Sequence, residues 1–272
     1  MGEISVSLVL YKTLRKDIDR ILSIINEIKL IDKFYLIDNS PEKLVSYEMF
    51  KKYDFVEYIF NNKNIGYGAG HNIAIKKSLL KKNKYHLVIN PDIYFESKIV
   101  LGLMDFMNKN SQIGLVMPKI LNENGSIQKV AKLLPRPIDL FQRAFLPYFF
   151  QKKNQRIFTL SKFKYDSVIQ VPYLSGCFMF LRVEAIKKAG AFDERFFMYP
   201  EDIDLTRRIY MIYKTVINPF FSVIHRHEKA SYKSLKMKII HIYNVIKYFN
   251  KWGWFYDKQR TKINKRILQQ FK

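Results

Sequence analysis

The sequence predicts an α/β fold in which a mostly parallel central sheet is flanked by helices, with a basic helical extension at the C-terminal end. Two observations support this prediction. Over the first 120 residues, short apolar runs typical of buried strands alternate with segments in which apolar residues recur every three or four positions, as in helices. Strands separated by helices form parallel sheets with right-handed crossovers. The chain is also long enough for a sizeable core, with 272 residues and 48% hydrophobic side chains.

The predicted strands follow one another at regular intervals. They span residues 4–11, 33–40, 55–61, 85–90 and 113–120. The first helix between them carries one apolar face, formed by Ile18, Ile21, Leu22, Ile25 and Ile28. A second helix opens at a glycine-rich turn within 62–72, and a third begins near Glu96 with Ser97 as its expected N-cap.

We assign residues 1–231 to one domain and residues 232–272 to a basic, amphipathic helical extension. Within the domain, residues 132–165 break the pattern with three prolines and many aromatic and basic residues. We expect an irregular insertion with one short amphipathic helix, which either folds over the surface or dips into a membrane interface. In the extension, Ile263, Ile267 and Phe271 recur at a spacing of four among basic residues.

Positive charge is the unusual feature of the composition, because 47 Lys and Arg face 24 Asp and Glu, a formal net charge of +23. Two blocks hold much of it: residues 132–164 have eight basic residues and one acid, and residues 229–272 have twelve and one. Such fields attract nucleic acid, nucleotide phosphates or an anionic membrane face. Low-GC codon usage is a second explanation for part of the lysine, since Asn and Ile are abundant as well.

The rest of the composition indicates a cytoplasmic protein. The single cysteine, Cys177, excludes an intrachain disulfide framework and is expected to be a small core residue. The opening run MGEISVSLVLYK has no basic n-region or small-residue cleavage site, so it is predicted to be the first strand and not a signal peptide. No stretch approaches the roughly 20 apolar residues that span a bilayer.

Acids follow two of the predicted strands. Asp38 ends the run KFYLIDNS, and Asp92 follows the apolar run HLVIN across a proline. Ligands of α/β sheets bind beyond the carboxyl ends of the strands, where both acids lie. Asn90 stands where a paired-acid metal motif would have its first acid, yet Mg²⁺ or Mn²⁺ needs only one or two protein carboxylates beside phosphate oxygens. The alternative for Asp92 is a solvated turn aspartate.

The stretch NKNIGYGAGHN, residues 62–72, allows close backbone approach at Gly66, Gly68 and Gly70. The helix that follows offers free N–H groups to an anion. This stretch is not a dinucleotide fingerprint, because it follows the third predicted strand and not the first. By itself, a glycine-rich turn is as often only a turn.

The densest acidic patch is FDERFFMYPEDIDLTRRI, residues 192–209. If a helix begins near Pro200, Glu201 and Asp202 lie in its first turn. There they either compensate the helix N-terminus or serve as a general base in a pocket lined with aromatic side chains. Asp204 is expected to pair with Arg207 or Arg208.

Two histidines, His225 and His227, alternate after the strand-like run TVINPFFSVIH and would face the same side of a strand. Metal or phosphate contact and a structural role are both open for them. The other histidines, His71, His86 and His241, have no such context and are expected to be structural.

Taken together and in order, these stretches resemble a known family: the family-2 inverting glycosyltransferases of the GT-A fold, in the bacterial rhamnosyltransferase-like branch. The matching pieces are VSLVLYKT, YLIDNS, NIGYGAGHNIAI, LVINPDIYF, SGCFMFLRVEAIKKAGAFDERFFMYPEDIDLTRRI and VIHRHEKAS. They cover the chain from about residue 4 to residue 231, whereas the basic tail fits the family pattern only loosely.

The resemblance implies a role for each matching residue. A pocket for the donor nucleotide-sugar would be lined by Tyr11, Asp38, Asn39, Asn64, Gly66, Asn72 and Asn90. Asp92 and His225 would hold Mg²⁺ or Mn²⁺ on the donor's diphosphate, with His227 as the alternative to His225. Asp202 would be the general base on the acceptor hydroxyl, and Glu201 would support the base or the acceptor. Asn90 in place of an acid makes the protein part of the metal site thin.

The resemblance also implies a substrate class and a location. The donor would be dTDP-L-rhamnose, or else a UDP- or GDP-hexose, and the acceptor a polyprenyl-diphosphate-linked saccharide in the synthesis of a bacterial surface polysaccharide. The enzyme would sit peripherally on the inner face of the cell membrane. The basic tail with Trp252 and Trp254 would bind that anionic surface.

Two other classes of protein fit parts of the sequence. A nucleic-acid-binding protein would explain the charge, but the basic blocks lie outside the acidic and glycine motifs, and no nucleic-acid motif is present. A sugar nucleotidyltransferase would place a glycine-rich loop after the first strand, where this chain reads YKTLRKD. A catalytically inactive relative is disfavoured by the presence of Asp92, Asp202 and His225.

Overall fold

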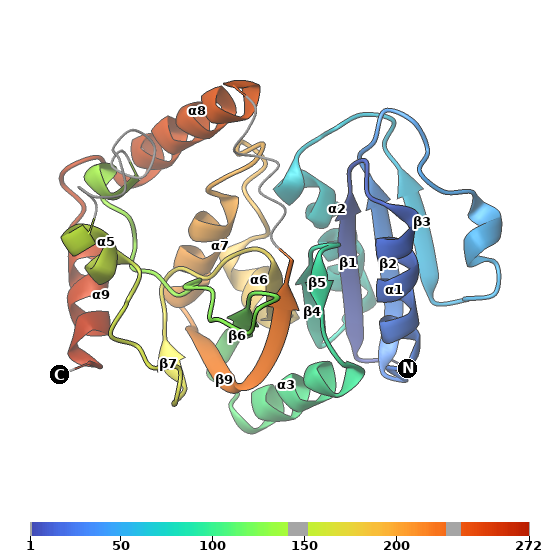
Figure 1. The fold of residues 1–272 in the computed structure, drawn as a ribbon, viewed down its shortest axis with the longest axis horizontal. Coiled ribbons are helices and arrows are strands. Elements are labelled where there is room, and N and C mark those ends of the chain that lie inside the picture. Colours follow the sequence, from blue (N-terminus) through green and yellow to red (C-terminus); the bar gives the residue numbers. More distant parts are fainter. Residues whose placement is uncertain (1, 141–151, 227–234, 272) are drawn as a thin grey trace.

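The computed structural model describes residues 2–140, 152–226 and 235–271. In this part of the chain, one nine-stranded sheet forms the centre of the molecule (Figure 1). The sheet has the strand order β3-β2-β1-β4-β8-β6-β9-β5, and β7 pairs with β9 outside this path. The predicted α/β class is confirmed.

The first four strands form an all-parallel half of the sheet: β1 (Ile4–Leu10), β2 (Ile31–Asp38), β3 (Val56–Phe60) and β4 (Tyr85–Ile89). The chain runs from β1 through β2 to β3 on one side, and then returns so that β4 pairs with the other side of β1. The strand order therefore reverses at β1. The carboxyl ends of β1 and β4 flank this switch point, which is where open α/β sheets bind ligands.

The second half of the sheet contains β5 (Ile93–Tyr94), β6 (Ile113–Leu121), β7 (Ile169–Gln170), β8 (Phe178–Arg182) and β9 (Lys214–His225). Strand β8 is antiparallel to both β4 and β6, whereas β6 and β9 are parallel to each other. Both β5 and β7 are antiparallel to β9. Six strands thus share one direction and three oppose it, so the sheet is mostly parallel, as predicted.

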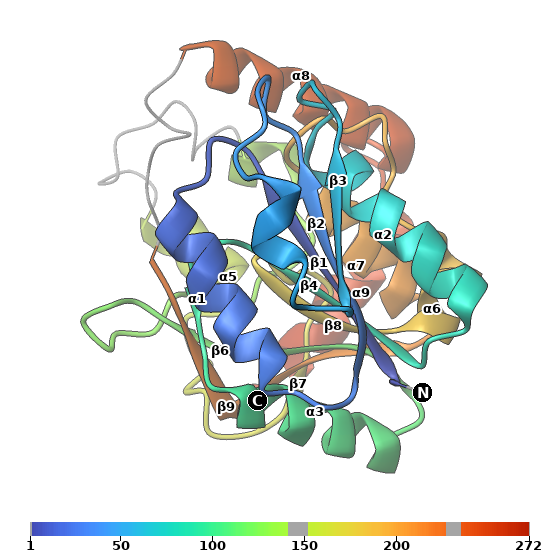
Figure 2. The ribbon, with the colours of Figure 1, turned by 90° about the vertical axis from the view of Figure 1, so that its right-hand side faces the viewer.

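Helices cover the sheet on both faces (Figure 2). Helix α1 (Arg15–Asn26) lies on one face, and α2 (Tyr67–Lys81) and α6 (Val183–Ala189) lie on the other. The remaining helices are the 3₁₀ turn η1 (Tyr47–Phe50), α3 (Ser97–Lys109), α5 (Lys152–Phe158), α7 (Glu201–Tyr210), α8 (Leu235–Trp252) and α9 (Lys258–Gln269).

The apolar periodicity of the first helix predicted its buried face correctly, since Ile18, Ile21, Leu22 and Ile25 are all buried in α1. The predicted capping of α3 is wrong. Ser97 is the first helical residue, and Glu96 occupies the N-cap position without a side-chain cap. The carboxylate of Glu96 instead pairs with Lys98 at 2.6 Å.

A buried polar chain joins β1, β4 and α2. The Oγ of Ser5 lies 2.7 Å from Nδ1 of His86, and the Oγ of Ser7 lies 2.9 Å from its Nε2 and 2.7 Å from Nδ1 of His71. Ser78 completes the chain by accepting the hydrogen bond of the Ser5 hydroxyl at 2.7 Å. Burial lowers the pKa of both histidines, that of His86 to about 3, so both are neutral structural residues.

The helices after the predicted boundary at residue 231 pack onto the sheet domain, while the boundary itself lies outside the described residues. Arg207 in α7 and Asp257 before α9 form a buried two-pronged ion pair at 2.8 and 2.9 Å. The Asn264 side chain bonds both backbone groups of Leu134. The apolar residues Ile263 and Ile267, which made this segment amphipathic in sequence, are buried.

The insertion at 132–165 is described only at its two ends, 132–140 and 152–165. Its short helix is α5. The apolar side chains around this helix are buried against the rest of the protein, among them Leu133, Leu134, Phe158, Leu160 and Phe163. The described parts of the insertion therefore pack onto the domain, while a membrane contact of the insertion stays a prediction.

The neutral histidines predict a pH dependence of stability. Between about pH 6.5 and the lowered pKa of His86, the unfolded chain binds a proton that the folded chain does not. The free energy of unfolding should therefore fall as the pH falls through this window, by up to about 1.4 kcal/mol per pH unit for each such histidine. Urea denaturation at neutral and mildly acidic pH measures this loss.

The variant His86→Gln tests the assignment, because its amide can still bond Ser5 and Ser7 but does not titrate. The variant should lose less stability on acidification than the parent chain. If the variant and the parent chain lost the same free energy of unfolding on acidification, groups other than His86 would be responsible for the pH dependence.

Candidate functional site

The edge of the sheet beyond β4 brings together the predicted metal ligands. Asp92 follows β4, and the pairing of β5 with β9 sets Ile93 opposite His225. The Oδ2 atom of Asp92 lies 3.2 Å from Nε2 of His225, and the Asp92 carbonyl accepts a hydrogen bond from the backbone N–H of Arg226 at 2.9 Å. Residues 133 positions apart in sequence thus meet because a two-residue strand pairs with the end of β9. His227, the alternative ligand, lies outside the described residues.

Gln128 orients the His225 ring. Its amide nitrogen donates to the His225 carbonyl at 2.8 Å, which turns its Oε1 toward Nδ1 of the ring at 3.1 Å. Nδ1 is therefore the protonated nitrogen, and Nε2 faces the Asp92 carboxylate. Metal-binding histidines commonly have this arrangement, with one nitrogen fixed by a hydrogen bond to an amide or carboxylate oxygen. No sequence signal pointed to Gln128.

The donor atoms of this pair fit a divalent cation. With Nδ1 protonated, Nε2 of His225 and Oδ2 of Asp92 are two acceptors 3.2 Å apart, an arrangement that a cation or a second ring proton would stabilise. The other oxygen, Oδ1 of Asp92, is buried and makes no hydrogen bond within the described residues. Those residues contain no group of three or more His, Cys, Asp or Glu that could hold a metal. The phosphates of a ligand would have to supply the remaining oxygens.

Arg20 of α1 fixes the loop that carries Asp92. Its guanidinium donates to the carbonyl of Pro91 at 2.6 Å and to that of Ile93 at 2.5 Å. The same group lies 3.6 Å from the centroid of the Tyr94 ring. One side chain therefore holds three of the residues around Asp92. Nothing in the sequence singles out Arg20, since an arginine in an amphipathic helix is usually solvated.

The dipeptide Gly176–Cys177 lies directly before β8. It forms hydrogen bonds both with the loop that carries Asp92 and with the predicted general base, Asp202. The backbone N–H of Asn90 donates to the Cys177 carbonyl, and the N–H of Gly176 donates to Oδ2 of Asp202, both at 3.1 Å. Tyr67 donates its hydroxyl to the Gly176 carbonyl at 2.6 Å. Asp92 and Asp202 thus sit on either side of one dipeptide. Cys177 is buried in the core, as predicted.

The electrostatics of Tyr67 support this grouping. Burial raises the pKa of its phenol well above the usual value. The charges of Glu201, Cys177, Asp202 and Asp92 raise it further. The phenol of Tyr67 therefore lies within electrostatic range of all three predicted acids, Asp92, Glu201 and Asp202.

Glu201 and Asp202 open α7, directly after Pro200, as the sequence predicted for the helix start. Burial raises the pKa of both carboxyls, and the charge of Asp202 raises that of Glu201 further. Asp202 has compensation, because the backbone N–H groups of Gly176 and Ile203 donate to it and Lys132 lies near enough to lower its pKa. Both carboxyls therefore hold a proton more tightly than a solvated acid does, and for Glu201 the charge of Asp202 adds to the effect of burial.

Glu201 has a polar atom that a ligand could bind. Its Oε2 atom is buried and makes no hydrogen bond within the described residues. A protonated carboxyl is a hydrogen-bond donor, so Glu201 can bind a hydroxyl or carbonyl oxygen that enters beside Asp202. The predicted pairing of Asp204 holds for Arg208, at 2.8 Å, but not for Arg207, which pairs with Asp257.

The glycine-rich turn lies against the same acidic helix. Gly66 has a φ of +96°, and a Cβ there would lie 2.4 Å from the Phe197 carbonyl. The Tyr67 N–H donates to that carbonyl at 3.0 Å. A Cβ at Gly68 would lie 3.6 Å from Cβ of Glu201. The turn therefore needs glycine because it is packed against residues 192–201, and α2 begins at this contact.

Three of the residues predicted for the donor pocket, Asn39, Asn64 and Gly66, lie together at the glycine-rich turn, and a fourth, Tyr11, follows β1. Asn39 donates to the Gly66 carbonyl at 3.0 Å and accepts from Asn61 at 2.8 Å, while Asn64 accepts from the Gly66 N–H at 3.0 Å. They hold the glycine turn over the end of β2. Tyr11, just beyond β1, is about half exposed and available to a ligand.

Asp38 and Asn72 are committed to the fold itself. Asp38 is fully buried, and its carboxylate accepts from the N–H groups of Ser40 and Leu44 and from the Tyr58 hydroxyl. The Asn72 side chain bonds both backbone groups of Phe192, and its amide also donates to Glu194. Contact of either residue with a donor stays a prediction.

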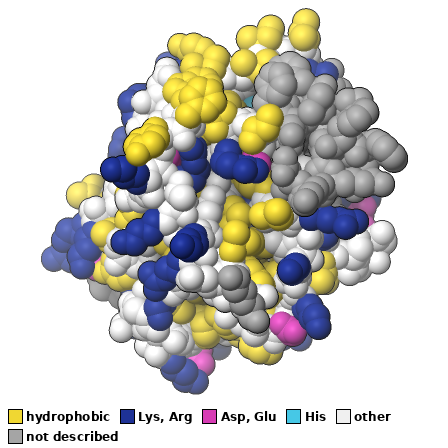
Figure 3. All heavy atoms as spheres, turned by 90° about the vertical axis from the view of Figure 1, so that its left-hand side faces the viewer, with side chains coloured by type: hydrophobic (Ala, Val, Ile, Leu, Met, Phe, Trp, Pro, Cys, Tyr) yellow, Lys and Arg dark blue, Asp and Glu magenta, His cyan; other side chains and the backbone are white. Residues whose placement is uncertain are grey.

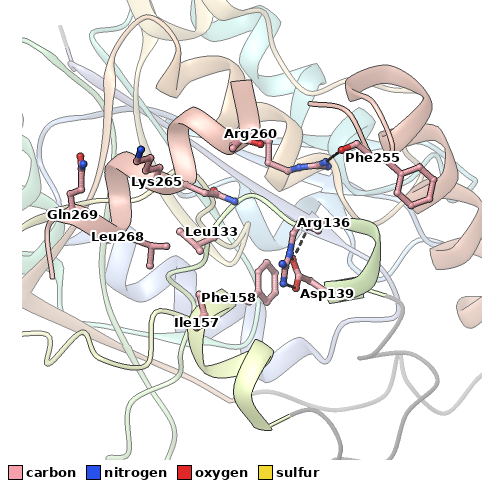
Figure 4. A pocket seen from close by; sticks show the side chains of 12 residues that line it. Leu133, Arg136, Asp139, Ile157, Phe158, Phe255, Arg260, Lys265, Leu268 and Gln269 are labelled. Atoms are coloured by element: carbon pink, nitrogen blue, oxygen red, sulfur yellow. Dashed lines mark hydrogen bonds and ion pairs between the residues drawn. The ribbon is translucent and has the colours of Figure 1, made fainter. Parts of the chain in front are cut away.

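A cavity of about 520 Å³ lies away from this edge, between residues 133–139, α5 and α9 (Figure 4). None of the predicted site residues line it. Its two arginines are already engaged, Arg136 with Asp139 and Arg260 with backbone carbonyls such as that of Trp254. The acids at the sheet edge, and not this cavity, form the candidate functional site.

The role of Gln128 can be tested by metal binding alone. Gln128→Leu removes the oxygen that faces Nδ1 of His225, so Mn²⁺ should bind about 10- to 100-fold more weakly. Electron paramagnetic resonance of free Mn²⁺, titrated with protein in the presence of a nucleoside diphosphate, measures this. Asp92→Ala should lose more. Gln112→Leu, at an exposed position, is the control, and equal affinity in all variants would contradict the assignment.

Comparison with curated proteins gives relatives of one kind, although no protein-family model matches the chain. The chain is 26% identical over 184 residues to an N-acetylglucosaminyl-diphospho-decaprenol L-rhamnosyltransferase of Mycobacterium tuberculosis, covering 63% of this chain and 57% of that protein. It is 25% identical to the low-salt glycan biosynthesis hexosyltransferase Agl10 of Haloferax volcanii, covering 76% and 62%. It is 23% identical to the rhamnosyltransferase WbbL of Escherichia coli, covering 79% and 83%. The chain thus matches less than two thirds of the length of the first two relatives.

Solved structures match the fold. GalNAc-T7, solved with UDP, GalNAc and Mn²⁺, aligns with a TM-score of 0.61 and 16% identity over 82% of this chain and 43% of that one. Residues 1–349 of Staphylococcus aureus TarS align with a TM-score of 0.56 and 14% identity over 90% and 66%. The central sheet and its helices are therefore those of GT-A glycosyltransferases. In fold and in sequence the chain is similar to the family-2, rhamnosyltransferase-like GT-A proteins, as the six stretches predicted.

Proposed function

We propose that the chain is an inverting glycosyltransferase, which moves a sugar from a nucleoside-diphosphate donor to a hydroxyl of a lipid-linked glycan. The observation that carries this proposal is the joining of Asp92–His225 and Asp202 through Gly176–Cys177. Such a transfer needs stabilisation of a leaving diphosphate and a base on the attacking hydroxyl. The two groups that can supply these lie on either side of one dipeptide.

Asp92 and His225 would hold Mg²⁺ or Mn²⁺, with Gln128 and Arg20 fixing their positions. When bound, the cation would neutralise the charge that develops on the leaving diphosphate. The GalNAc-T7 structure supports a divalent metal, because it contains UDP and Mn²⁺ on the same fold. Since the described residues offer only two candidate ligands here, the diphosphate is expected to complete the coordination.

Asp202 would take the proton of the acceptor hydroxyl as that oxygen attacks the anomeric carbon. Two backbone hydrogen bonds stabilise its charged form, and the pKa that burial raises makes it a better base than a solvated aspartate. Glu201, neutral beside it, would donate a hydrogen bond to the acceptor or to the sugar. A single displacement inverts the anomeric carbon and needs no covalent nucleophile, which agrees with the burial of Cys177.

The proposed donor is dTDP-L-rhamnose, because two of the relatives are named rhamnosyltransferases. Tyr11, Asp38, Asn39, Asn64, Gly66, Asn72 and Asn90 are the residues we propose around it. The proposed acceptor is a saccharide on polyprenyl diphosphate, in the synthesis of a surface polysaccharide. The name of the mycobacterial relative supports an acceptor of this kind.

We place the protein in the cytoplasm, on the inner face of the cell membrane, where such an acceptor is presented. The net charge of +23 supports attraction to an anionic surface. No helix in the described residues has the length and apolar character needed to cross a membrane. Vesicle binding should weaken as salt is raised, because salt screens charges on the protein surface.

A donor screen tests the class and the sugar together. The melting temperature should rise with Mn²⁺ and dTDP-L-rhamnose more than with UDP-, GDP- or CMP-sugars, because only the bound donor completes the metal site. The rise should vanish in Asp92→Ala. A response to RNA or DNA, with none to any nucleotide-sugar, would contradict the proposal and favour a nucleic-acid-binding protein.

Asp202→Asn tests the base. The variant keeps the shape of the side chain but cannot take a proton, so the turnover number should fall by about 10²- to 10⁴-fold. The dissociation constant of the donor, measured by calorimetry, should stay within about twofold, since Asp202 is proposed to act on the acceptor. Asp166→Asn, at an exposed position, is the control. A turnover close to that of the parent enzyme would rule out Asp202 as the base.

The pH profile gives a further test. An aspartate with a raised pKa loses its charge at a higher pH than a solvated one, so activity should begin to fall above the ordinary pKa of 3.8 as the pH is lowered. The turnover number measured across acidic pH with saturating donor reports this limb. A profile that stays flat down to about pH 4 would contradict the raised pKa.

A further inference from the structure

Helix α8 has an apolar face that no other described residue covers. Five side chains lie on this outer face, each between 40% and 74% exposed: Leu235, Ile239, Ile242, Tyr243 and Ile246. They recur at spacings of three and four, so they form one stripe along the helix. The turn after α8 adds two aromatic side chains that are more than 80% exposed, Phe255 and Tyr256. Figure 3 views the left-hand side of the molecule as drawn in Figure 1, and hydrophobic side chains gather at the top of that view, where the end of α8 lies.

The opposite face of α8 holds the segment that leads to the proposed base. Asn244 donates to the Met198 carbonyl at 2.8 Å, and Lys247 donates to the Arg195 carbonyl at 2.7 Å. The rings of Tyr199 and His241 stack with centroids 4.9 Å apart. The helix is therefore fixed to residues 195–199, just before Glu201 and Asp202. Whatever binds its outer face is brought close to the candidate site.

The charges around the stripe are all of one sign. Lys238 lies one helical turn from Leu235 and from Ile242, and Lys247 lies one turn from Tyr243 on the other side, 4.3 Å from the ring centroid. Neither α8 nor α9 contains an acidic residue. The acid between them, Asp257, is buried and paired with Arg207. An apolar stripe edged by lysine and free of acids is typical of helices that lie in the surface of an anionic membrane.

Of the two tryptophans expected to bind a membrane, Trp252 is directed inward, whereas Trp254 is 37% exposed. Trp252 donates its indole N–H to Asp204 at 2.8 Å and lies over the guanidinium of Arg207, 3.9 Å from the ring centroid. The apolar residues of α9, Ile263 and Ile267, are buried in the core. Among the described helices of the extension, α8 therefore presents the larger exposed apolar face.

We propose that α8 docks flat on an anionic phospholipid bilayer, with Leu235, Ile239, Ile242, Tyr243 and Ile246 inserted below the headgroups and Lys238 among the phosphates. The choice of a bilayer as the partner rests on the proposed function, which places the acceptor in a membrane. Docking through α8 would hold residues 195–202, and with them the base, at the membrane surface.

Vesicle cosedimentation of the full chain tests this surface. The double variant Ile239→Glu/Ile246→Glu places two charges in the stripe and should bind vesicles of equal parts phosphatidylglycerol and phosphatidylcholine at least about tenfold more weakly. The parent chain should bind pure phosphatidylcholine weakly. The matched control is Leu80→Glu/Ile212→Glu, which makes the same change of charge at two exposed positions elsewhere and should bind much more like the parent.

Three results would overturn the proposal: equal binding by the stripe variant, an equal loss in the control, or a dimer in sedimentation velocity that the stripe variant dissociates without losing vesicle binding. The experiment needs no donor or metal, so it is independent of catalysis. Donor hydrolysis in solution, measured in parallel, should be the same in the parent and the stripe variant. Vesicle binding without any hydrolysis would count against the proposed function but not against the docking surface.

Discussion

The antiparallel pairing of β8 with β4 is the constraint on which the candidate site depends. It places the dipeptide Gly176–Cys177 beside the end of β4, where Asn90 and Asp202 each form a hydrogen bond with its backbone. Without this pairing, nothing would bring the loop that carries Asp92 and the helix that begins with Glu201 and Asp202 to the same dipeptide. Backbone groups set the position, so the side chains of the site can be reserved for ligands.

A second constraint acts on the charges. Burying two neighbouring carboxyls is unfavourable unless one is neutral, and the structure gives backbone donors to Asp202 and none to the Oε2 atom of Glu201. The same logic applies to the pair of Asp92 and His225, where Gln128 fixes the ring so that two acceptors face one another. Both places keep polar atoms unsatisfied in the described structure. Such atoms are expected where a substrate or ion completes the bonding.

The C-terminal helices α8 and α9 contact the segments around the candidate site on one side and solvent on the other. The buried pair of Arg207 and Asp257 ties α7, which carries the acids, to the turn between α8 and α9. Breaking a buried ion pair by removing one partner costs about 3–5 kcal/mol, so this tie is a strong one. The described helices of the extension are therefore packed onto the part of the protein that carries the candidate site. Their inner face supports the site, and their outer face is left for a surface.

By itself, the sequence determined the class of fold, the order of strands and helices in the first half, and the acids and glycines of the site. These follow from local causes: apolar periodicity, strand-end carboxylates, and a turn in which Gly66 has no room for a Cβ. Only the tertiary structure decided which residues meet. In the structure Asp204 pairs with Arg208 and not with Arg207, and Gln128 and Arg20 hold the residues around the candidate metal ligands. Trp252 points inward, whereas the apolar stripe of α8 is exposed. The reason is physical: periodicity says that a side chain has a face, but pairing between distant strands and helices decides what that face touches.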